Sequence, residues 1–150
     1  NGNCTCRVAE RARHLSNVSG PLLDRLDVFI QTSADSTVVT PGDAESSAVI
    51  AERVMQARER AQERWSQAGI DESVNARVAP TLIRKQFPAD EAAMAYLSSL
   101  LRTGSITQRG VDRSLKVAWT LADLEGVAQP DIDHVARAVD MRTAPEEVAA

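Results

Sequence analysis

The sequence predicts a mainly α-helical fold, and three observations support this prediction. Apolar residues recur at spacings of three and four in four segments, which is the period of an α-helix. Capping residues precede these segments, and glycines follow three of them. A short β-branched and aromatic run, Val28-Phe29-Ile30, predicts one strand near the N-terminal end. We therefore expect a helical unit that is preceded by a strand and a turn.

The first and longest helix is expected over 44–68, after the chain break at Pro41-Gly42, with Asp43 as its N-cap. Its apolar stripe consists of Ile50, Val54, Ala57, Ala61 and Trp65. Its other face alternates acids and arginines, and we interpret it as a solvated surface. These charged residues are Glu52, Arg53, Glu59, Arg60, Glu63 and Arg64.

Three shorter helices are expected to pack together over 89–142. The first has Asp90 as N-cap and ends at Gly104, the second runs from Thr107 to Gly126, and the third has Pro130 in its first turn. The residues expected to face the core are Met94, Leu97, Leu100, Leu101, Val111, Leu115, Ala118, Leu121, Ile132, Val135, Ala136 and Val139. A helical turn is also expected near 81–85.

The sequence supports a specific structural prediction for two residues within these helices, Gly110 and His134. Gly110 lies in the first turn of its helix, where glycine often marks a close approach of backbone or ligand. His134 is expected to be an ordinary, partly exposed position. The divisions that follow from the chain breaks are 1–32, 33–43 (a linker), 44–88, 89–142 and 143–150 (a disordered tail).

The composition limits the class of protein. With 150 residues and a net charge of -4, the chain is not expected to be a dedicated nucleic-acid-binding domain, although a local arginine-rich face is compatible with that charge. No apolar run reaches the roughly 18 residues of a membrane span, and no signal segment is present. The two cysteines are too close for an ordinary disulfide, which favours the cytoplasm. Because the chain starts at Asn1, we expect a piece of a longer protein.

Common catalytic motifs are absent from this sequence. It contains no G-x-x-x-x-G-K-[ST], H-E-x-x-H, G-x-S-x-G or G-x-G-x-x-G pattern, so the chain alone is not expected to be catalytic. Cys4 and Cys6 are weak candidates for a metal site, with His14 as a poorly spaced third ligand. A closed structural zinc site needs four ligands, so two free thiols are the favoured interpretation.

Arg25 lies in the stretch SGPLLDRLD, between Asp24 and Asp27. Leu22 and Leu23 can hold this turn against a core. On the residues alone, we favour an ordinary surface ion pair between Arg25 and these acids. The alternative is a guanidinium that projects from a subunit edge and stabilises charge on a phosphoryl group in another subunit.

Arg109 and Arg113 are four residues apart at the start of the second short helix, so they share one helical face. Two cations there oppose each other and the positive end of the helix dipole. They need either acidic partners, from Asp112 or a neighbouring helix, or an anionic ligand. Both possibilities remain open at this stage.

Four motifs resemble one known family. A C-x-C pair precedes an S-G-P-L-L-D-R-[IL]-D block by the usual spacing, an E-S-S opens the long helix at Glu45-Ser46-Ser47, and an N-A pair stands at Asn75-Ala76. Residues 107–126 match S-x-R-G-x-x-R-x-L-[KR]-V-A-x-T-[IL]-A-D-L-x-G almost throughout, with Thr107 in place of the first serine. Over about 4–142, the chain resembles the C-terminal part of magnesium-chelatase-like AAA+ ATPases of the ComM (YifB) type. The C-P-C-G pair of that family is absent, which weakens the metal hypothesis.

The resemblance implies a fold and a set of roles. It implies an AAA+ C-terminal helical lid over 89–142, a pre-lid insertion over 44–88, and a remnant strand and turn of the α/β ATPase core over 1–32. Arg25 matches the arginine finger, which acts in trans on a neighbouring subunit's ATP. Arg109 matches the sensor-2 arginine that contacts nucleotide phosphates, in its own subunit or a neighbour, and Arg113 is an auxiliary residue.

The resemblance also implies ligands and partners for the full-length protein. These are ATP and Mg²⁺, neighbouring subunits of a hexameric ring, and single-stranded DNA as the remodelled substrate. Metal insertion, as in chelatases, is the other possible process. The alternatives from a different class are a non-catalytic helical interaction or DNA-contacting module, and a plain dimerisation bundle.

Overall fold

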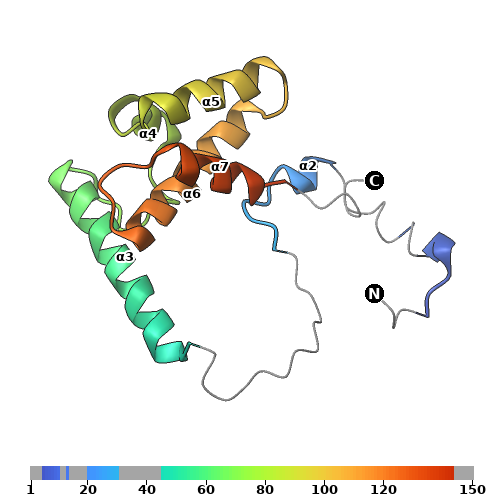
Figure 1. Ribbon diagram of the computed structural model, residues 1–150, viewed down its shortest axis with the longest axis horizontal. Helices are drawn as coiled ribbons and strands as arrows, with labels where there is room; N and C mark the ends of the chain where they lie inside the picture. The colour runs from blue at the N-terminus through green and yellow to red at the C-terminus, as the bar shows by residue number, and fades with distance from the viewer. Residues whose placement is uncertain (1–4, 11–12, 14–19, 31–44, 144–150) are drawn as a thin grey trace.

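The computed structural model describes residues 5–10, 13, 20–30 and 45–143, and the mainly α-helical class is confirmed. Helix α6 lies at the centre and contacts α3, α4, α5 and α7, as the ribbon in Figure 1 shows. The described helices include α2 (Gly20–Leu23), α3 (Ser47–Gln67), α4 (Pro80–Gln86), α5 (Glu91–Arg102), α6 (Gln108–Glu125) and α7 (Ile132–Asp140).

Helix α6 follows the sequence prediction closely. The Thr107 hydroxyl caps it by accepting a hydrogen bond from the Gly110 amide at 3.0 Å, and Gly126 ends it in the left-handed conformation at φ +74°. All four residues expected to face the core are buried, and they are Val111, Leu115, Ala118 and Leu121. Because α6 buries residues around most of its circumference, it is the element on which the others pack.

Gly110 permits a close contact inside this unit. A Cβ atom at Gly110 would lie 2.4 Å from Cγ1 of Ile106, well inside van der Waals contact. A close approach is therefore present at Gly110, but the approaching group is the Ile106 side chain and not the backbone or ligand that was expected. This packing fixes the loop before α6 against the first turn of the helix.

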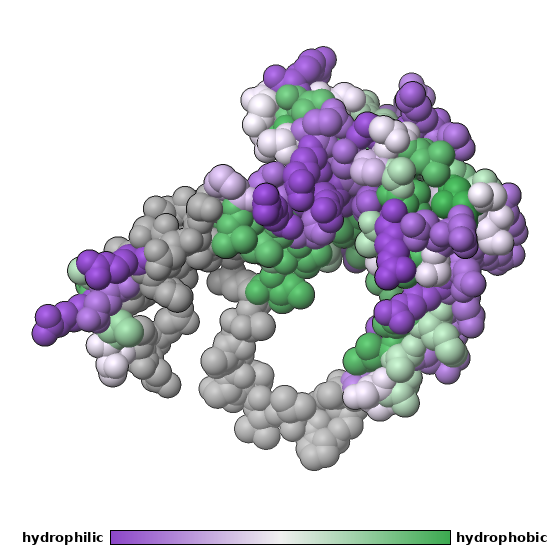
Figure 2. Space-filling view, turned by 180° about the vertical axis from the view of Figure 1, so that it is seen from behind, coloured by the Kyte–Doolittle hydropathy of each residue, from purple (hydrophilic) through white to green (hydrophobic). Residues whose placement is uncertain are grey.

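Helix α3 is anchored by only one of its halves. Its N-cap is Ser46, whose hydroxyl accepts from the Val49 amide, whereas the predicted cap Asp43 lies outside the described residues. Ala57, Ala61 and Trp65 are buried as expected, but Ile50 is 46% exposed and Val54 37%. Among the described residues, no element covers the N-terminal half, which projects from the bundle (Figure 1) and shows apolar atoms among charged ones (Figure 2).

Helices α5 and α7 both pack against α6 and contact each other. Asp90 caps α5 as predicted, accepting from the Ala93 amide at 2.7 Å. Helix α7 is capped by Asp131, so Pro130 precedes the helix instead of lying in its first turn. The Pro130 carbonyl accepts a hydrogen bond from the Asp90 amide at 2.9 Å. The predicted turn near 81–85 is α4. Two of the expected core residues, Leu101 and Ile132, are exposed near helix ends.

The predicted strand at 28–30 is absent from the described part of the chain. A strand requires a neighbouring strand with which to exchange backbone hydrogen bonds. The Phe29 amide instead donates to the carbonyl of Met141, just after α7, at 2.6 Å. The segment after α2 is thus attached to the end of the helical bundle. No described helix has the length and apolar character needed to cross a bilayer.

Candidate functional site

Arg25 lies in a tight turn that follows α2. We call residues 22–27 the Arg25 turn. The Arg25 amide donates to the Leu22 carbonyl at 3.0 Å, and the Leu26 amide donates to the Leu23 carbonyl at 3.1 Å. The Arg25 side chain is exposed, and no acceptor among the described residues contacts its guanidinium. The backbone of this turn is therefore ordered while its cation faces solvent.

The acids beside Arg25 do not pair with it. Asp27 Oδ2 lies 2.7 Å from Arg113 Nη1, and Asp24 Oδ2 lies 3.7 Å from Arg109 Nε. The local surface ion pair favoured from the sequence is therefore wrong, because tertiary partners bind both carboxylates. These contacts join the Arg25 turn to the first turns of α6.

Arg109 and Arg113 differ in how strongly they are engaged. The Arg109 side chain is 48% exposed and, among the described residues, has only the long contact to Asp24, whereas Arg113 is 32% exposed and forms a short hydrogen bond to Asp27. Asp112, which was a candidate partner for both, pairs with Arg84 instead. The two arginines do find acids, but these come from the Arg25 turn and not from a neighbouring helix.

Lys116 extends the row of cations on α6 by one more turn. Its ammonium donates to the Ala76 carbonyl at 2.6 Å. Burial, and next the nearby Arg113 guanidinium, lower the pKa of Lys116 below its ordinary value. Arg109, Arg113 and Lys116 thus form one positive stripe, with spacings of four and three, that Asp24 and Asp27 partly neutralise.

Arg142, which was not predicted from the sequence as a site residue, completes the contacts of the Arg25 turn. Its side chain is only 9% exposed and lies just beyond α7, against Asp24 and Asp27. No motif marks this arginine. The only signal available in the sequence is that the turn contains two acids and one arginine, which leaves a carboxylate without a local partner.

A second polar cluster joins α3 to the end of α6. Arg64 donates to both carboxylate oxygens of Asp123, at 2.6 and 2.8 Å, and to Asn75 at 3.0 Å. Asn75 in turn donates to Asp123 at 2.8 Å, and Arg60 donates to the Asp123 carbonyl at 2.6 Å. The interpretation of this α3 face as a solvated surface is therefore wrong at Arg64, whereas Arg60 is exposed although it makes this tertiary hydrogen bond.

Aromatic rings enclose this cluster. The Arg64 guanidinium lies 4.0 Å from the ring centroid of Trp119 and 4.7 Å from that of Trp65. The Trp65 ring also meets Phe87 edge-on, with centroids 5.0 Å apart, and its indole nitrogen donates to Asn75 at 3.0 Å. Stacking on aromatic faces compensates the buried guanidinium, whose Nε has no hydrogen-bond partner.

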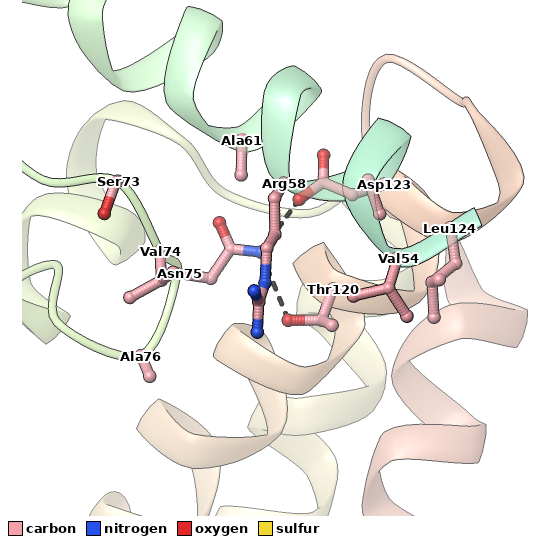
Figure 3. Close-up of a pocket in the computed structure, with 11 residues that line it drawn as sticks. Val54, Arg58, Ala61, Ser73, Val74, Asn75, Ala76, Thr120, Asp123 and Leu124 are labelled. Atoms are coloured by element: carbon pink, nitrogen blue, oxygen red, sulfur yellow. Dashed lines mark hydrogen bonds between the residues drawn. The ribbon is translucent and has the colours of Figure 1, made fainter. Parts of the chain in front are cut away.

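A pocket of about 270 Å³ opens beside this cluster, between α3, the loop before α4, and α6. In Figure 3, Asn75 reaches from the loop to Thr120 and Asp123, and Val54 and Leu124 line the other side. The amide of Asn75 and the carboxylate of Asp123 both have hydrogen-bond partners within the protein. The cluster therefore acts as a structural connection between α3, the loop before α4 and α6.

His134 is buried, contrary to the expectation of partial exposure. In a capping box, its amide donates to Asp131 Oδ1 at 3.1 Å and its Nδ1 accepts from the Asp131 amide at 3.4 Å. Nδ1 also lies 2.5 Å from Asp131 Oδ1, and Nε2 lies 3.2 Å from Glu125 Oε2. Hydrogen bonds from the His134 amide and then from its ring lower the pKa of Asp131. The hydrogen bond from Arg137 is the main cause that lowers the pKa of Glu125. His134 thus has a structural role at the start of α7.

The metal candidates remain without structural support. Cys6 is exposed, whereas Cys4 and His14 lie outside the described residues. Within the described ranges, no three His, Cys, Asp or Glu side chains are close enough together to hold a metal ion.

Comparison with known proteins identifies the family of this arrangement. Residues 44–142 match the family model described as magnesium chelatase, subunit ChlI C-terminal, and residues 1–39 match the model for magnesium chelatase, subunit ChlI. The chain belongs to the magnesium-chelatase-like family. Helices α3 to α7 lie within the matched C-terminal domain, which is the helical lid region of AAA+ proteins; the division of this domain into an insertion over 44–88 and a lid over 89–142 stays a prediction. The predicted resemblance is confirmed.

Curated relatives support membership of the magnesium-chelatase-like family. An uncharacterized protein of Mycobacterium tuberculosis is 42% identical over 141 residues, covering 93% of the chain and 28% of that protein. Competence protein ComM of Haemophilus influenzae is 32% identical, covering 87% and 25%, and YifB of Escherichia coli is 33% identical, covering 91% and 26%. The chain thus spans about a quarter of the length of the relatives it matches.

Proposed function

We propose that this chain is the finger and lid region of a ring-forming AAA+ ATPase, and that Arg25 acts in trans on ATP bound by a neighbouring subunit. The observation that carries the proposal is the contrast within the Arg25 turn. Both acids bind other arginines, whereas the Arg25 guanidinium projects into solvent without an acceptor among the described residues. A guanidinium supplied in trans to a phosphoryl group accelerates its transfer by about 10³- to 10⁵-fold.

Arg109 is the proposed sensor-2 residue. It is half-exposed at the start of α6, and its contact with Asp24 is long enough to be exchanged for a phosphate oxygen. Arg113 is less available, because it holds Asp27 at 2.7 Å. We therefore assign Arg113 an auxiliary role in supporting the Arg25 turn beside the nucleotide.

Arg109 and Arg25 are proposed to meet the same nucleotide. Arg109 contacts Asp24, the residue directly before Arg25, so the two guanidinium groups belong to one edge of the subunit. If Arg25 reaches a neighbour's ATP, Arg109 is best placed to act in trans as well. The described residues include no group of three or more His, Cys, Asp or Glu side chains that could hold a metal ion, and Mg²⁺ is assigned to no residue of this chain.

The process that hydrolysis drives is proposed to be DNA remodelling in the cytoplasm. The support is the similarity to competence protein ComM over 87% of the chain, together with the motifs of the ComM type. Metal chelation is the competing process, because the matching family models carry the chelatase name. ATPase stimulation by single-stranded DNA, compared with stimulation by a porphyrin and Mg²⁺, separates these two processes.

A helical interaction module is the second candidate function. The observation that favours it is the projecting half of α3, where Val49, Ile50 and Met55 are about half-exposed. Such a module would need no nucleotide. It predicts that the complete protein neither binds nor hydrolyses ATP.

The deciding experiment compares Arg25→Ala with the exposed control Arg102→Ala in the complete protein. We expect Arg25→Ala to lower the hydrolysis rate at least about 10³-fold while ATP affinity changes less than about threefold, because the finger acts on transferring charge. Arg102→Ala should behave like the wild type. Equal losses of binding and turnover in Arg25→Ala would count against the finger.

Mixing the two variants, at an ATP concentration too low to saturate Arg109→Ala, tests whether Arg109 acts in trans. If both arginines serve the neighbour's nucleotide, subunits with Arg25→Ala mixed with subunits with Arg109→Ala form no complete site, and activity stays absent. If Arg109 instead acts on the ATP of its own subunit, a complete site forms wherever an Arg25→Ala subunit binds the ATP and an adjacent Arg109→Ala subunit supplies Arg25. Restored activity would therefore reject the trans assignment of Arg109 while leaving that of Arg25 intact.

A further inference from the structure

Arg142 forms hydrogen bonds to the backbone on both sides of Arg25. Its Nη1 donates to the Leu26 carbonyl at 3.1 Å and to Asp27 Oδ1 at 3.3 Å. Its Nη2 donates to the Asp24 carbonyl at 3.4 Å. One nearly buried guanidinium thus satisfies acceptors before and after the residue that projects into solvent.

A second set of contacts attaches the same segment to the end of α7. The Phe29 amide donates to the Met141 carbonyl at 2.6 Å, beside Arg142. A hollow of about 290 Å³ lies next to these contacts, lined by Leu23, Phe29 and Val139 among others. Hydrogen bonds to the backbone and the ion pair between Arg142 and Asp27 therefore hold the segment at the end of α7.

The α6 contacts of the turn have a different geometry. Arg109 and Arg113 reach only the carboxylates of Asp24 and Asp27, which can rotate about their side-chain bonds. Arg142 alone among the described arginines binds main-chain carbonyls of the turn. Main-chain contacts fix the Cα positions around Arg25, and hence the direction in which its side chain leaves the turn.

We propose that Arg142 is a positioning residue that sets the direction of Arg25 and couples it to the position of the lid. Because Arg142 follows α7, any rotation of the lid carries the Arg25 turn with it. Lid movement in one subunit would thereby advance or withdraw the arginine presented to the next subunit. This inference rests on the proposed finger role of Arg25.

The test uses Arg142→Gln and Arg142→Lys in the complete protein, with Arg137→Gln as the matched control. Arg137 is 51% exposed on α7 and pairs with Glu125, away from the Arg25 turn. We expect Arg142→Gln to lower kcat roughly 10- to 100-fold, the cost of a misplaced catalytic group, with KM for ATP unchanged within about twofold. Arg142→Lys, which retains charge and donors, should recover part of kcat, and Arg137→Gln should have no effect.

A double substitution separates positioning from general stability. Once Arg25 is removed, Arg142 has nothing to position, so Arg25→Ala/Arg142→Gln should hydrolyse ATP at the same residual rate as Arg25→Ala. Amide exchange of the 150-residue chain gives a second measurement. In Arg142→Gln, exchange should rise over residues 25–29 while α5 and α6 keep their protection.

The outcomes distinguish two failures. If Arg25→Ala is active, the finger proposal itself is wrong. If Arg25→Ala is inactive but Arg142→Gln keeps the wild-type kcat, the finger stands and the positioning role is overturned. Loss of protection throughout the lid in both Arg142 variants, or a further loss of rate in the double variant, would also overturn it, because Arg142 would then support the fold as a whole.

Discussion

Arg64 and Asp123 lie 59 residues apart in the sequence and form a two-point ion pair, with nitrogen–oxygen distances of 2.6 and 2.8 Å. The Asp123 side chain is 2% exposed and that of Arg64 16%. This pair fastens α3 to the C-terminal end of α6. Asn75 shares the same carboxylate, so the loop before α4 joins the connection as well.

The first prediction concerns this pair. Asp123→Ala should lower the free energy of unfolding by about 3 kcal/mol, because it leaves the Arg64 guanidinium largely buried without its counter-charge. Urea denaturation of the 150-residue chain measures the change. Glu59→Ala, at an exposed position on the same helix as Arg64, is the control and should change stability by less than about 0.5 kcal/mol. A loss below 1 kcal/mol in Asp123→Ala would show that water replaces the carboxylate.

The second prediction reverses the usual effect of glycine in a helix. Replacing a helical glycine with alanine normally stabilises a helix by about 1 kcal/mol. Gly110→Ala should instead destabilise the chain by about 1–3 kcal/mol, since the new methyl would overlap Cγ1 of Ile106. In an Ile106→Ala background the clash is absent, so the same change should become neutral or stabilising. Thermal denaturation of the four chains gives the comparison, and equal effects in both backgrounds would exclude the clash.

The third prediction is a pH dependence at the start of α7. The pKa of Asp131 is lowered from its ordinary 3.8 by hydrogen bonds from His134, so the folded state favours the carboxylate. This contribution to stability is present above about pH 4 and is lost as the pH falls through the lowered folded-state pKa. Asp131→Asn should therefore flatten the decline of stability between about pH 4 and 2. Asp133→Asn, at a residue whose side chain accepts none of the cap's hydrogen bonds, should keep the wild-type slope.

The fourth prediction concerns nucleotide affinity. Arg109→Ala in the complete protein should weaken ATP binding by about 10- to 100-fold, the value of one charge-assisted hydrogen bond to phosphate. Isothermal titration with a non-hydrolysable ATP analogue measures the change. Arg102→Ala, another exposed lid arginine, should bind the analogue like the wild type. Unchanged affinity in Arg109→Ala would remove this residue from the proposed site.

The local signals in the sequence predicted the bundle well. Asp90, Thr107 and Gly126 mark helix ends through side-chain or backbone geometry that depends only on adjacent residues. Periodicity likewise identified the buried face of α6. It could not indicate that Ile50 and Val54 on α3 would stay exposed, because periodicity shows which residues share a face and not whether another element covers that face.

The charge contacts were harder to predict. Asp24 and Asp27 stand beside Arg25 in the sequence, and the local pairing was therefore favoured over partners more than 80 residues away. Arg142 lies outside every motif that was recognised in the sequence. The family motifs nevertheless placed Arg25 and Arg109 as candidates, and the structure brings Arg109 against the residue next to Arg25. Their roles in ATP chemistry remain predictions.

The one-sided anchoring of α3 gives this helix the mechanics of a lever. Its buried residues begin at Ala57, ten residues after its first residue Ser47, which at 1.5 Å per residue leaves an arm of about 15 Å beyond the anchor. Arg64 and Trp65 hold the opposite end, where the arm meets the rest of the protein. A slight tilt of this anchored end would displace the N-terminal end of α3 by a larger distance. A spin label or dye near Val49 would therefore report movements that are too small to detect at the anchored end itself.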